Sequence, residues 1–334
     1  MSACEEGAFR HQGIQIAMDA LVGCRGFIGS ILARQREFGA QFDSSTFRNA
    51  APDTYGTIVC AAAPGSMFEA NRFPDRDMGR IESLIAQLTR VRAERFVLIS
   101  SIAVLADFGA GADEETVDFQ TATAYGRNRR TLEVFCSSHF DNCLILRLPA
   151  LFGPGLRKNF LFDILNPMPS YVDRPRMTAM SQQLPPPLGA GLARLYTWND
   201  ELGLFVIDRT ALDASGRRAD YDSAVLDQGL SALQFTNRQS RFQFYELGRL
   251  ADDIDLLSRH SVEVAHLATE PLDAALVFEA VTGSPMPETT AKLHLEDMRT
   301  RYAALWRSKP PYISSAGATL GRLRLFFDRQ RDNP

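Results

Sequence analysis

The chain has no apolar run that reaches the ~18 residues needed to cross a membrane as a helix. It has no excess of basic residues either, because its formal net charge is −4, so binding to nucleic acid is not expected. Residues 1–17 contain Glu5 and Glu6 and no apolar core, which is unlike a signal peptide. We therefore expect a cytoplasmic protein that binds neither membranes nor nucleic acids, with residues 1–17 as an N-terminal extension.

Cysteine and histidine are both scarce. The five cysteines are scattered and odd in number, so they predict neither a disulfide framework nor a metal site. The five histidines form no motif. We expect reduced thiols, as is usual in the cytoplasm, and no bound metal. The cysteines are Cys4, Cys24, Cys60, Cys136 and Cys143.

Glycines at a spacing of three follow the first strand pattern. The apolar run 20–22 reads as a strand, and Gly23, Gly26 and Gly29 come next, where a helical pattern begins. In a strand–turn–helix unit these glycines permit a tight turn, a close approach to a pyrophosphate, and packing of the helix on the strand. The stretch predicts a dinucleotide-binding turn, with a structural glycine-rich turn as the alternative.

Strand and helix patterns then alternate along the first half of the chain. Apolar residues make up 45% of the sequence, which is typical of a globular protein. This alternation predicts an α/β protein, a Rossmann-type doubly wound parallel sheet with its ligand at the carboxyl ends of the strands. The expected helices are 27–38, 75–91 and 123–138, and the expected strands are a short one closing at Phe42, then 57–63, 95–99 and 142–148.

The pattern loosens in the second half. Residues 166–191 contain six prolines and predict an irregular lid or loop. Helical patterns return at 247–258, 272–281, 291–306 and 316–329. We expect a dinucleotide-binding domain at 18–165. Residues 166–334 are expected to form mainly a smaller substrate-binding region, with some segments returning to the sheet.

A hydroxyl, a phenol and a cation fall where catalysis would need them. Ser101 ends a predicted strand, and Tyr125 and Arg129 are four residues apart and so share a helical face. A phenol can pass a proton to or from a substrate oxygen, a hydroxyl can steady that oxygen, and a cation can hold a ribose and lower the phenol pKa. The alternatives are a helix-start aromatic at Tyr125 and a strand-end cap at Ser100 and Ser101.

Four passages together resemble a known family: GCRGFIGS at 23–30, FVLISSIAV at 96–104, YGRNR at 125–129 and RLPALFGPG at 147–155. The chain resembles the extended short-chain dehydrogenase/reductases of the NAD(P)-dependent epimerase/dehydratase type, which act on nucleotide sugars. The resemblance covers most of the chain from residue 18 onward.

The resemblance implies a catalytic set. Ser101 supplies the hydroxyl, Tyr125 is the general acid/base, and Arg129 stands where the family usually has Lys. This is a departure, because Arg stays charged and cannot easily relay a proton. The implied cofactor-binding residues are Gly23, Arg25, Gly26, Phe27, Ile28, Gly29, Asp43, Ser44, Ala61, Ala62, Ala63, Ser100, Tyr125, Arg129 and Pro149.

Two residues bear on cofactor choice. Arg25 lies inside the glycine turn, where similar reductases use Arg to reach the 2′-phosphate of NADP. Asp43 stands near the end of the second strand, where an acidic residue binds the free 2′-hydroxyl of NAD. Ser44, Ser45, Thr46 and Arg48 could equally surround a phosphate. We favour NADP(H), with NAD(H) as the alternative.

Substrate contacts follow from the resemblance alone. Asn159 is the candidate for the nucleotide diphosphate, with Arg157 and Lys158 beside it. Arg241, or else Arg238, is the candidate arginine for the same group. Solvated surface charge is the alternative for all of them.

The favoured function is a ketoreductase that transfers a hydride between NADP(H) and a carbon of a nucleotide-linked sugar. The alternatives are a nucleotide-sugar epimerase, an oxidoreductase acting on a non-sugar secondary metabolite, and a non-catalytic dinucleotide-binding protein. The family also implies a homodimer through helices 75–91 and 123–138. Its face would be supplied by Met78, Ile85, Leu132 and Phe135.

Overall fold

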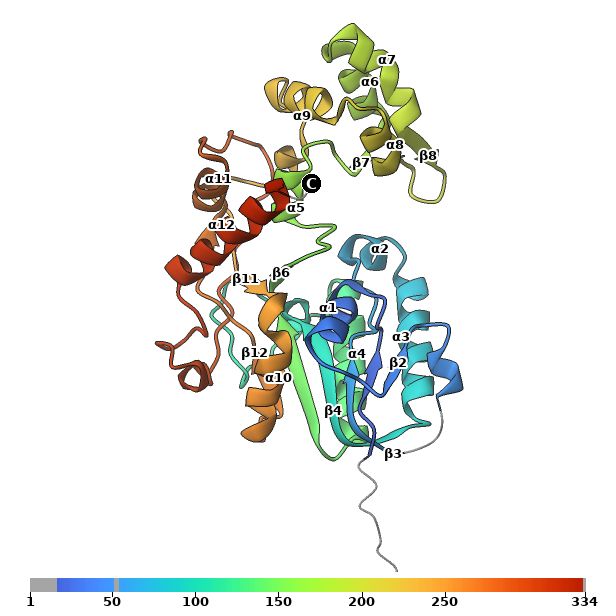
Figure 1. The fold of residues 1–334 in the computed structure, drawn as a ribbon, viewed down its shortest axis with the longest axis vertical. Coiled ribbons are helices and arrows are strands. Elements are labelled where there is room, and N and C mark those ends of the chain that lie inside the picture. The colour runs from blue at the N-terminus through green and yellow to red at the C-terminus, as the bar shows by residue number, and fades with distance from the viewer. Residues whose placement is uncertain (1–16, 51–53, 333–334) are drawn as a thin grey trace, which may run out of the picture.

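Six strands form a parallel sheet at the centre of the molecule (Figure 1). The structure is a computed structural model that describes residues 17–50 and 54–332, so nearly all of the expected extension 1–17 lies outside the described residues. The strands are β1 (Ala20–Val22), β2 (Ala40–Phe42), β3 (Thr54–Cys60), β4 (Arg92–Ser101), β5 (Cys143–Leu148) and β12 (Val264–His266). Their order is β2-β1-β3-β4-β5-β12, with every pair parallel. This confirms the predicted fold class.

Helices cover both faces of the sheet, as the alternating apolar pattern of the strands requires. Leu21, Val59 and Val97 pack with α1 (Phe27–Gln35) and α10 (Leu250–Arg259). The neighbouring strand residues point to the other face and pack with α3 (Pro74–Leu88) and α4 (Ala124–His139). Figure 1 shows α10 and α3 on opposite sides of the sheet.

The strand order reverses at β1, which lies between β2 and β3. The connection after β1 runs through α1 on one face of the sheet, and the connection after β3 runs through α3 on the other. At such a switch point the connections part and leave a crevice at the carboxyl ends of the strands. The glycine turn follows β1 at this place.

A buried polar network joins β5 to α4 beneath that edge. Arg147 donates two hydrogen bonds to Glu133, at 3.0 and 2.8 Å, and both side chains are almost fully buried. The Ser100 hydroxyl donates to the same carboxylate at 2.7 Å. Arg147 also meets His266 of β12, and burial lowers the pKa of this imidazole. The network therefore connects three strands of the sheet, β4, β5 and β12, to α4.

The second half of the chain contains more regular structure than the sequence pattern predicts. The expectation of an irregular 166–191 is wrong, because α6 (Arg174–Gln183) and α7 (Pro186–Leu195) occupy most of it. Both helices have proline in their first turn, where the missing N–H costs nothing. With β7 (Tyr171–Val172), β8 (Tyr196–Asn199), β9 (Leu204–Ile207), α8 (Arg209–Ala214) and α9 (Arg218–Asp227) they build a small unit, seen at the top of Figure 1.

The remaining segments pack beside the sheet. The expected C-terminal helices are confirmed at α10, α11 (Ala274–Thr282) and α12 (Ala316–Asp332). The expected helix 291–306 is wrong, since only Ala303–Trp306 forms a 3-10 turn. Backbone N–H groups there bond to distant carbonyls, as Glu296 does to Arg241. The other elements are α2 (Met67–Arg72), β6 (Ala150–Phe152), α5 (Phe160–Leu165), β10 (Arg241–Phe242), β11 (Phe244–Glu246) and β13 (Leu272–Asp273).

Within the described residues, no helix combines the length and the apolar content that crossing a membrane requires.

Candidate active site

The glycine turn has no room for side chains at two of its positions. Gly23 has φ +93°, and a Cβ there would lie 2.6 Å from the carbonyl oxygen of Ala61. A Cβ on Gly29 would lie 2.1 Å from the carbonyl oxygen of Gly23. Gly26 precedes the first residue of α1 and is less crowded. The turn thus brings backbone close to backbone at a helix N-terminus, which fits a dinucleotide pyrophosphate.

The other predicted cofactor residues border the same edge of the sheet. Phe27 and Ile28 open α1 and pack partly against the core. β3 ends at Cys60 and not at Ala63 as expected, so Ala61 to Ala63 follow the strand end as half-buried residues. Pro149 is buried just after β5.

Arg25 and Asp43 meet at the end of β2. Arg25 Nε lies 2.9 Å from Asp43 Oδ2, and its side chain is 81% exposed. The other carboxylate oxygen accepts hydrogen bonds from the backbone and hydroxyl groups of Ser45 and Thr46. These bonds, above all the one from the Ser45 hydroxyl, hold the pKa of Asp43 well below its usual range. Ser45 and Thr46 are therefore engaged with Asp43, whereas Ser44 is exposed.

Ser101 and Tyr125 are brought together by a close helix contact. Ser101 ends β4 and its Oγ accepts from the N–H of Ala103 at 3.2 Å. A Cβ on Gly126 would lie 2.0 Å from the Ala103 carbonyl oxygen, so only glycine lets the start of α4 approach this turn. Ser101 is thus both the cap at the end of β4 and the hydroxyl that pairs with Tyr125.

The Tyr125 phenol is held in its protonated form. Burial raises its pKa above the ordinary value of about 10, against the Arg129 charge and a hydrogen bond with Ser101, which both lower it. The Asp77 charge adds to the increase. At neutral pH the phenol is therefore a proton donor.

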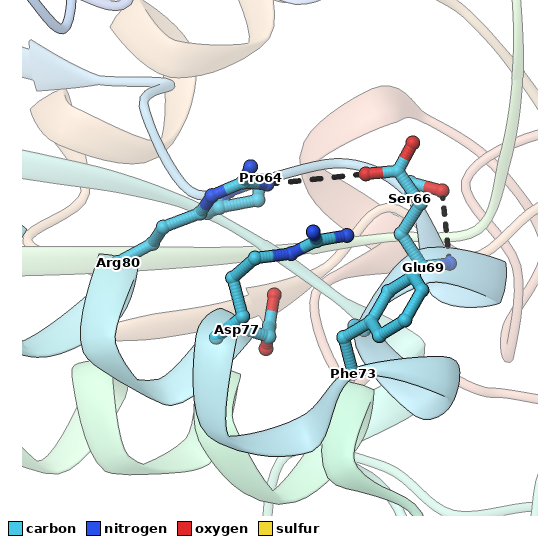
Figure 2. A pocket seen from close by; sticks show the side chains of 8 residues that line it. Pro64, Ser66, Glu69, Phe73, Asp77 and Arg80 are labelled. Carbon is cyan, nitrogen blue, oxygen red and sulfur yellow. Dashed lines mark hydrogen bonds and ion pairs between the residues drawn. The ribbon is translucent and has the colours of Figure 1, made fainter. Parts of the chain in front are cut away.

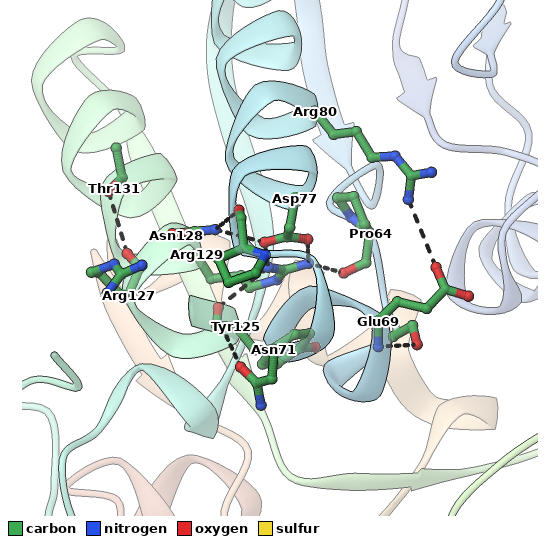
Figure 3. Close-up of polar contacts among 12 residues, drawn as sticks. Pro64, Glu69, Asn71, Asp77, Arg80, Tyr125, Arg127, Asn128, Arg129 and Thr131 are labelled. Atoms are coloured by element: carbon green, nitrogen blue, oxygen red, sulfur yellow. Dashed lines mark hydrogen bonds and ion pairs between the residues drawn. The ribbon is translucent and has the colours of Figure 1, made fainter. Parts of the chain in front are cut away.

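Arg129 is buried and bound within the protein (Figure 3). Its guanidinium makes an ion pair with both carboxylate oxygens of Asp77, donates to the Pro64 carbonyl, and lies 4.0 Å from the centre of the Tyr125 ring. The resemblance predicted that Arg129 would hold a ribose and acidify the phenol. The structure places it under the Tyr125 ring, with its hydrogen bonds directed to α3 and to the loop after β3.

A small cavity between α2 and α3 borders this ion pair (Figure 2). Pro64, Glu69, Phe73, Asp77 and Arg80 are among its lining residues. Its free volume of about 10 Å³ holds at most one water molecule. It is far too small for a dinucleotide, so it is not the predicted cofactor site.

The other predicted residues are occupied elsewhere or lie apart. The Ser100 hydroxyl is directed to Glu133, so cofactor contact would fall to the Ser100 backbone. Asn159 caps α5 by accepting from the N–H groups of Leu161 and Phe162, and it donates to Leu151. Arg241 is exposed on β10, and no contact links it to Tyr125 in the described part of the chain.

Several residues of the site were missed. Asn71 of α2 accepts from the Tyr125 N–H at 3.0 Å. Lys158, already named beside Asn159, donates to the carbonyl oxygen of Gly65. Asp77 binds Arg129 across two helices. The sequence does contain a sign of this pair: Asp77 lies on the same apolar stripe of its helix as Met78 and Ile81, and a buried carboxylate needs a charged partner.

No protein-family model matches the chain, and no curated protein is similar to it in sequence. Solved structures are similar in fold. A dTDP-4-dehydrorhamnose reductase from Bacillus anthracis str. Ames, in complex with NADP, has 12% identity and a TM-score of 0.59 over 95% of this chain and 100% of that one.

Two further structures show the same likeness. A UDP-N-acetylglucosamine 4-epimerase from Methanobrevibacter ruminantium M1, in complex with UDP-N-acetylmuramic acid, has 12% identity and a TM-score of 0.60, covering 96% and 100% of the two chains. An NAD-dependent NDP-hexosamine 5,6-dehydratase has 14% identity and a TM-score of 0.57, covering 95% and 98%. The chain therefore has the fold of the extended short-chain dehydrogenase/reductases, which confirms the resemblance at the level of the fold.

Proposed function

We propose that the protein is an NAD(P)-dependent ketoreductase acting on the keto or hydroxy carbon of a nucleotide-linked sugar. One observation supports this most strongly: the Tyr125 phenol and the Ser101 hydroxyl meet at the same sheet edge as the glycine turn. Reductases, epimerases and a dehydratase of nucleotide sugars share the fold.

The cofactor, when bound, supplies or accepts the hydride. Tyr125 then donates a proton to the substrate oxygen, since its phenol is protonated at neutral pH. Ser101 shares a hydrogen bond with the Tyr125 phenol, so its hydroxyl would turn from the phenol to the substrate oxygen when the substrate binds. Gly23 permits the tight turn, Gly26 lets the backbone approach the pyrophosphate, and Gly29 lets α1 pack close to the turn.

NADP(H) is the proposed cofactor, because the exposed Arg25 side chain can turn from Asp43 to a 2′-phosphate. Arg25→Ala is expected to weaken NADPH binding about 10- to 100-fold, the value of a charge-assisted hydrogen bond, and to leave NADH binding nearly unchanged. Fluorescence titration with both nucleotides checks this. Arg301→Ala, at an exposed ion pair with Glu115, serves as the control. Equal losses for NADPH and NADH would contradict the assignment.

A homodimer in the cytoplasm remains part of the proposal. Met78, Ile85 and Phe135 are half-buried on α3 and α4, which pack against each other. Leu132 is only 1% exposed and belongs to the core, so it is not available for a dimer face. Cys24, Cys60, Cys136 and Cys143 are free thiols, which is compatible with a reducing compartment.

The reaction type is tested with keto derivatives of nucleotide sugars and NADPH. A ketoreductase consumes one NADPH for each alcohol formed, whereas an epimerase converts a hydroxy sugar to its isomer without net consumption. Turnover of NADPH with a keto sugar supports the proposal. Isomerisation without consumption would replace it by the epimerase, and nicotinamide binding without any turnover by the non-catalytic alternative.

A further inference from the structure

The hydrogen-bond donors of Arg129 are almost all used inside the protein. A guanidinium has five N–H groups. Two on Nη1 face Asp77 and the Tyr125 carbonyl, and two on Nη2 face Pro64 and Asp77. The fifth, on Nε, is buried without a partner in the described residues. Arg129 has no exposed donor left for a ribose hydroxyl.

Asp77 is bound just as completely. Both of its oxygens pair with Arg129, and Oδ2 also accepts from Asn128 Nδ2 at 2.8 Å. The side chains of Arg129 and Asp77 are 3% and 5% exposed. A bidentate pair of this kind is stiff, and its two charges cancel at a distance. Tyr125 therefore stacks on a fixed unit that is nearly neutral overall.

We propose that Asp77 is a positioning residue that acts through Arg129: it holds the guanidinium beneath the Tyr125 ring, with its donors engaged inside the protein, and offsets part of its charge. The inference deepens the proposed ketoreductase function and rests on it only for its consequence. Because the phenol keeps its proton, the site is set to donate that proton and so favours reduction of a carbonyl over oxidation of an alcohol.

The proposed reaction is the reduction of a carbonyl group to an alcohol. A hydride from bound NAD(P)H forms the new C–H bond, and the carbonyl π electrons move to the oxygen. That oxygen takes the Tyr125 proton, and solvent returns a proton to the phenolate. The carbonyl is reduced and the nicotinamide is oxidised.

The charged groups around Tyr125 come from several elements. Arg129 lies on the same helix, Asp77 on α3, and Ser101 at the end of β4 supplies the neutral partner. Lys158, after β6, and Glu69 of α2 face the ion pair from the outside. Arg129 lowers the Tyr125 pKa and Asp77 raises it. Loss of the Arg129 charge must therefore raise the Tyr125 pKa, and loss of the Asp77 charge must lower it.

The experiment is a phenolate absorbance titration of the cofactor-free protein, with the Tyr125→Phe spectrum subtracted to isolate Tyr125. Asp77→Asn keeps the shape of the side chain and leaves the Arg129 charge uncancelled. It is expected to lower the titration midpoint of Tyr125 by about 1 pH unit. Arg129→Met is expected to raise the midpoint. The double variant, which lacks both charges, is expected to titrate between the two single variants, because Arg129 lowers the Tyr125 pKa more than Asp77 raises it.

Glu133→Gln is the matched control, because Glu133 lies on the same helix as Tyr125 and forms an equally buried pair with Arg147 of β5. It is expected to lower stability and leave the Tyr125 midpoint unchanged. Equal midpoints in wild type and Asp77→Asn would overturn the proposal, as would shifts of the same sign in both single variants. If a single variant fails to fold, the folded double variant decides: a midpoint below that of the wild type contradicts the proposal.

Nicotinamide binding is measured separately on the same proteins. The expected titration without nicotinamide binding would leave the role of Asp77 intact and remove the ketoreductase. Nicotinamide binding with unchanged Tyr125 midpoints would remove the role of Asp77 and leave the ketoreductase proposal intact.

Discussion

Tyr125→Phe is expected to lower kcat for carbonyl reduction by about 10²- to 10⁴-fold, the contribution of a positioned proton donor. The change removes only the phenol O–H. The ring keeps its place over Arg129, and the backbone N–H keeps its bond to Asn71. Affinity for NADPH should therefore stay within about twofold of the wild type, because the glycine turn is untouched.

The measurement is NADPH oxidation with a keto substrate at saturating cofactor. Tyr302→Phe is a suitable control, since its hydroxyl makes no hydrogen bond to the described residues and its ring packs at the edge of the core. Full activity in Tyr125→Phe would remove this phenol from the mechanism. The non-catalytic alternative predicts no reaction in either protein.

Gly29→Ala is expected to damage both the fold and the cofactor site. The added Cβ would lie 2.1 Å from the Gly23 carbonyl oxygen and 2.7 Å from its carbon, both of which are backbone atoms that cannot rotate away. Overpacking of this kind costs about 3 kcal/mol of unfolding free energy at the upper end of its range. Any folded fraction should have lost nicotinamide binding, because α1 must move away from the turn.

Gly79→Ala provides the contrast. Gly79 lies within α3, and an added Cβ would meet nothing within 4 Å. Replacing a helical glycine should raise the unfolding free energy by roughly 0.5–1 kcal/mol. Chemical denaturation of both variants tests the pair of expectations. Similar stabilities for the two would show that Gly29 is not needed for close packing.

The fold was predictable where one local pattern decides the structure. The run 20–22 with its three glycines, and the Tyr125 helix after the Ser101 strand, needed only periodicity and turn chemistry. Prolines usually break helices, so the sequence does not predict the helices within 166–191, although three of the prolines, Pro175, Pro186 and Pro187, fall in first turns. The division at residue 165 stays a prediction.

The site was predictable as a set of positions and less so as a set of contacts. Ser101 and Tyr125 do meet, but Arg129 is turned to Asp77, a residue 52 positions away in the chain. Such pairing depends on how α3 packs against α4, which a single sequence does not reveal. For the same reason the sequence does not reveal that the Ser100 hydroxyl bonds to Glu133. Nor does it reveal that the Asn159 amide caps the start of α5.

The central claim is that the turn at Gly23, Gly26 and Gly29 holds a nicotinamide dinucleotide. The most direct test is a fluorescence titration of the purified protein with NADPH and NADH, after checking for nucleotide already bound. We predict saturable binding of NADPH that is tighter than that of NADH. Tighter binding of NADH would move the adenosine ribose contact from Arg25 to Asp43, and binding of neither nucleotide would contradict the account.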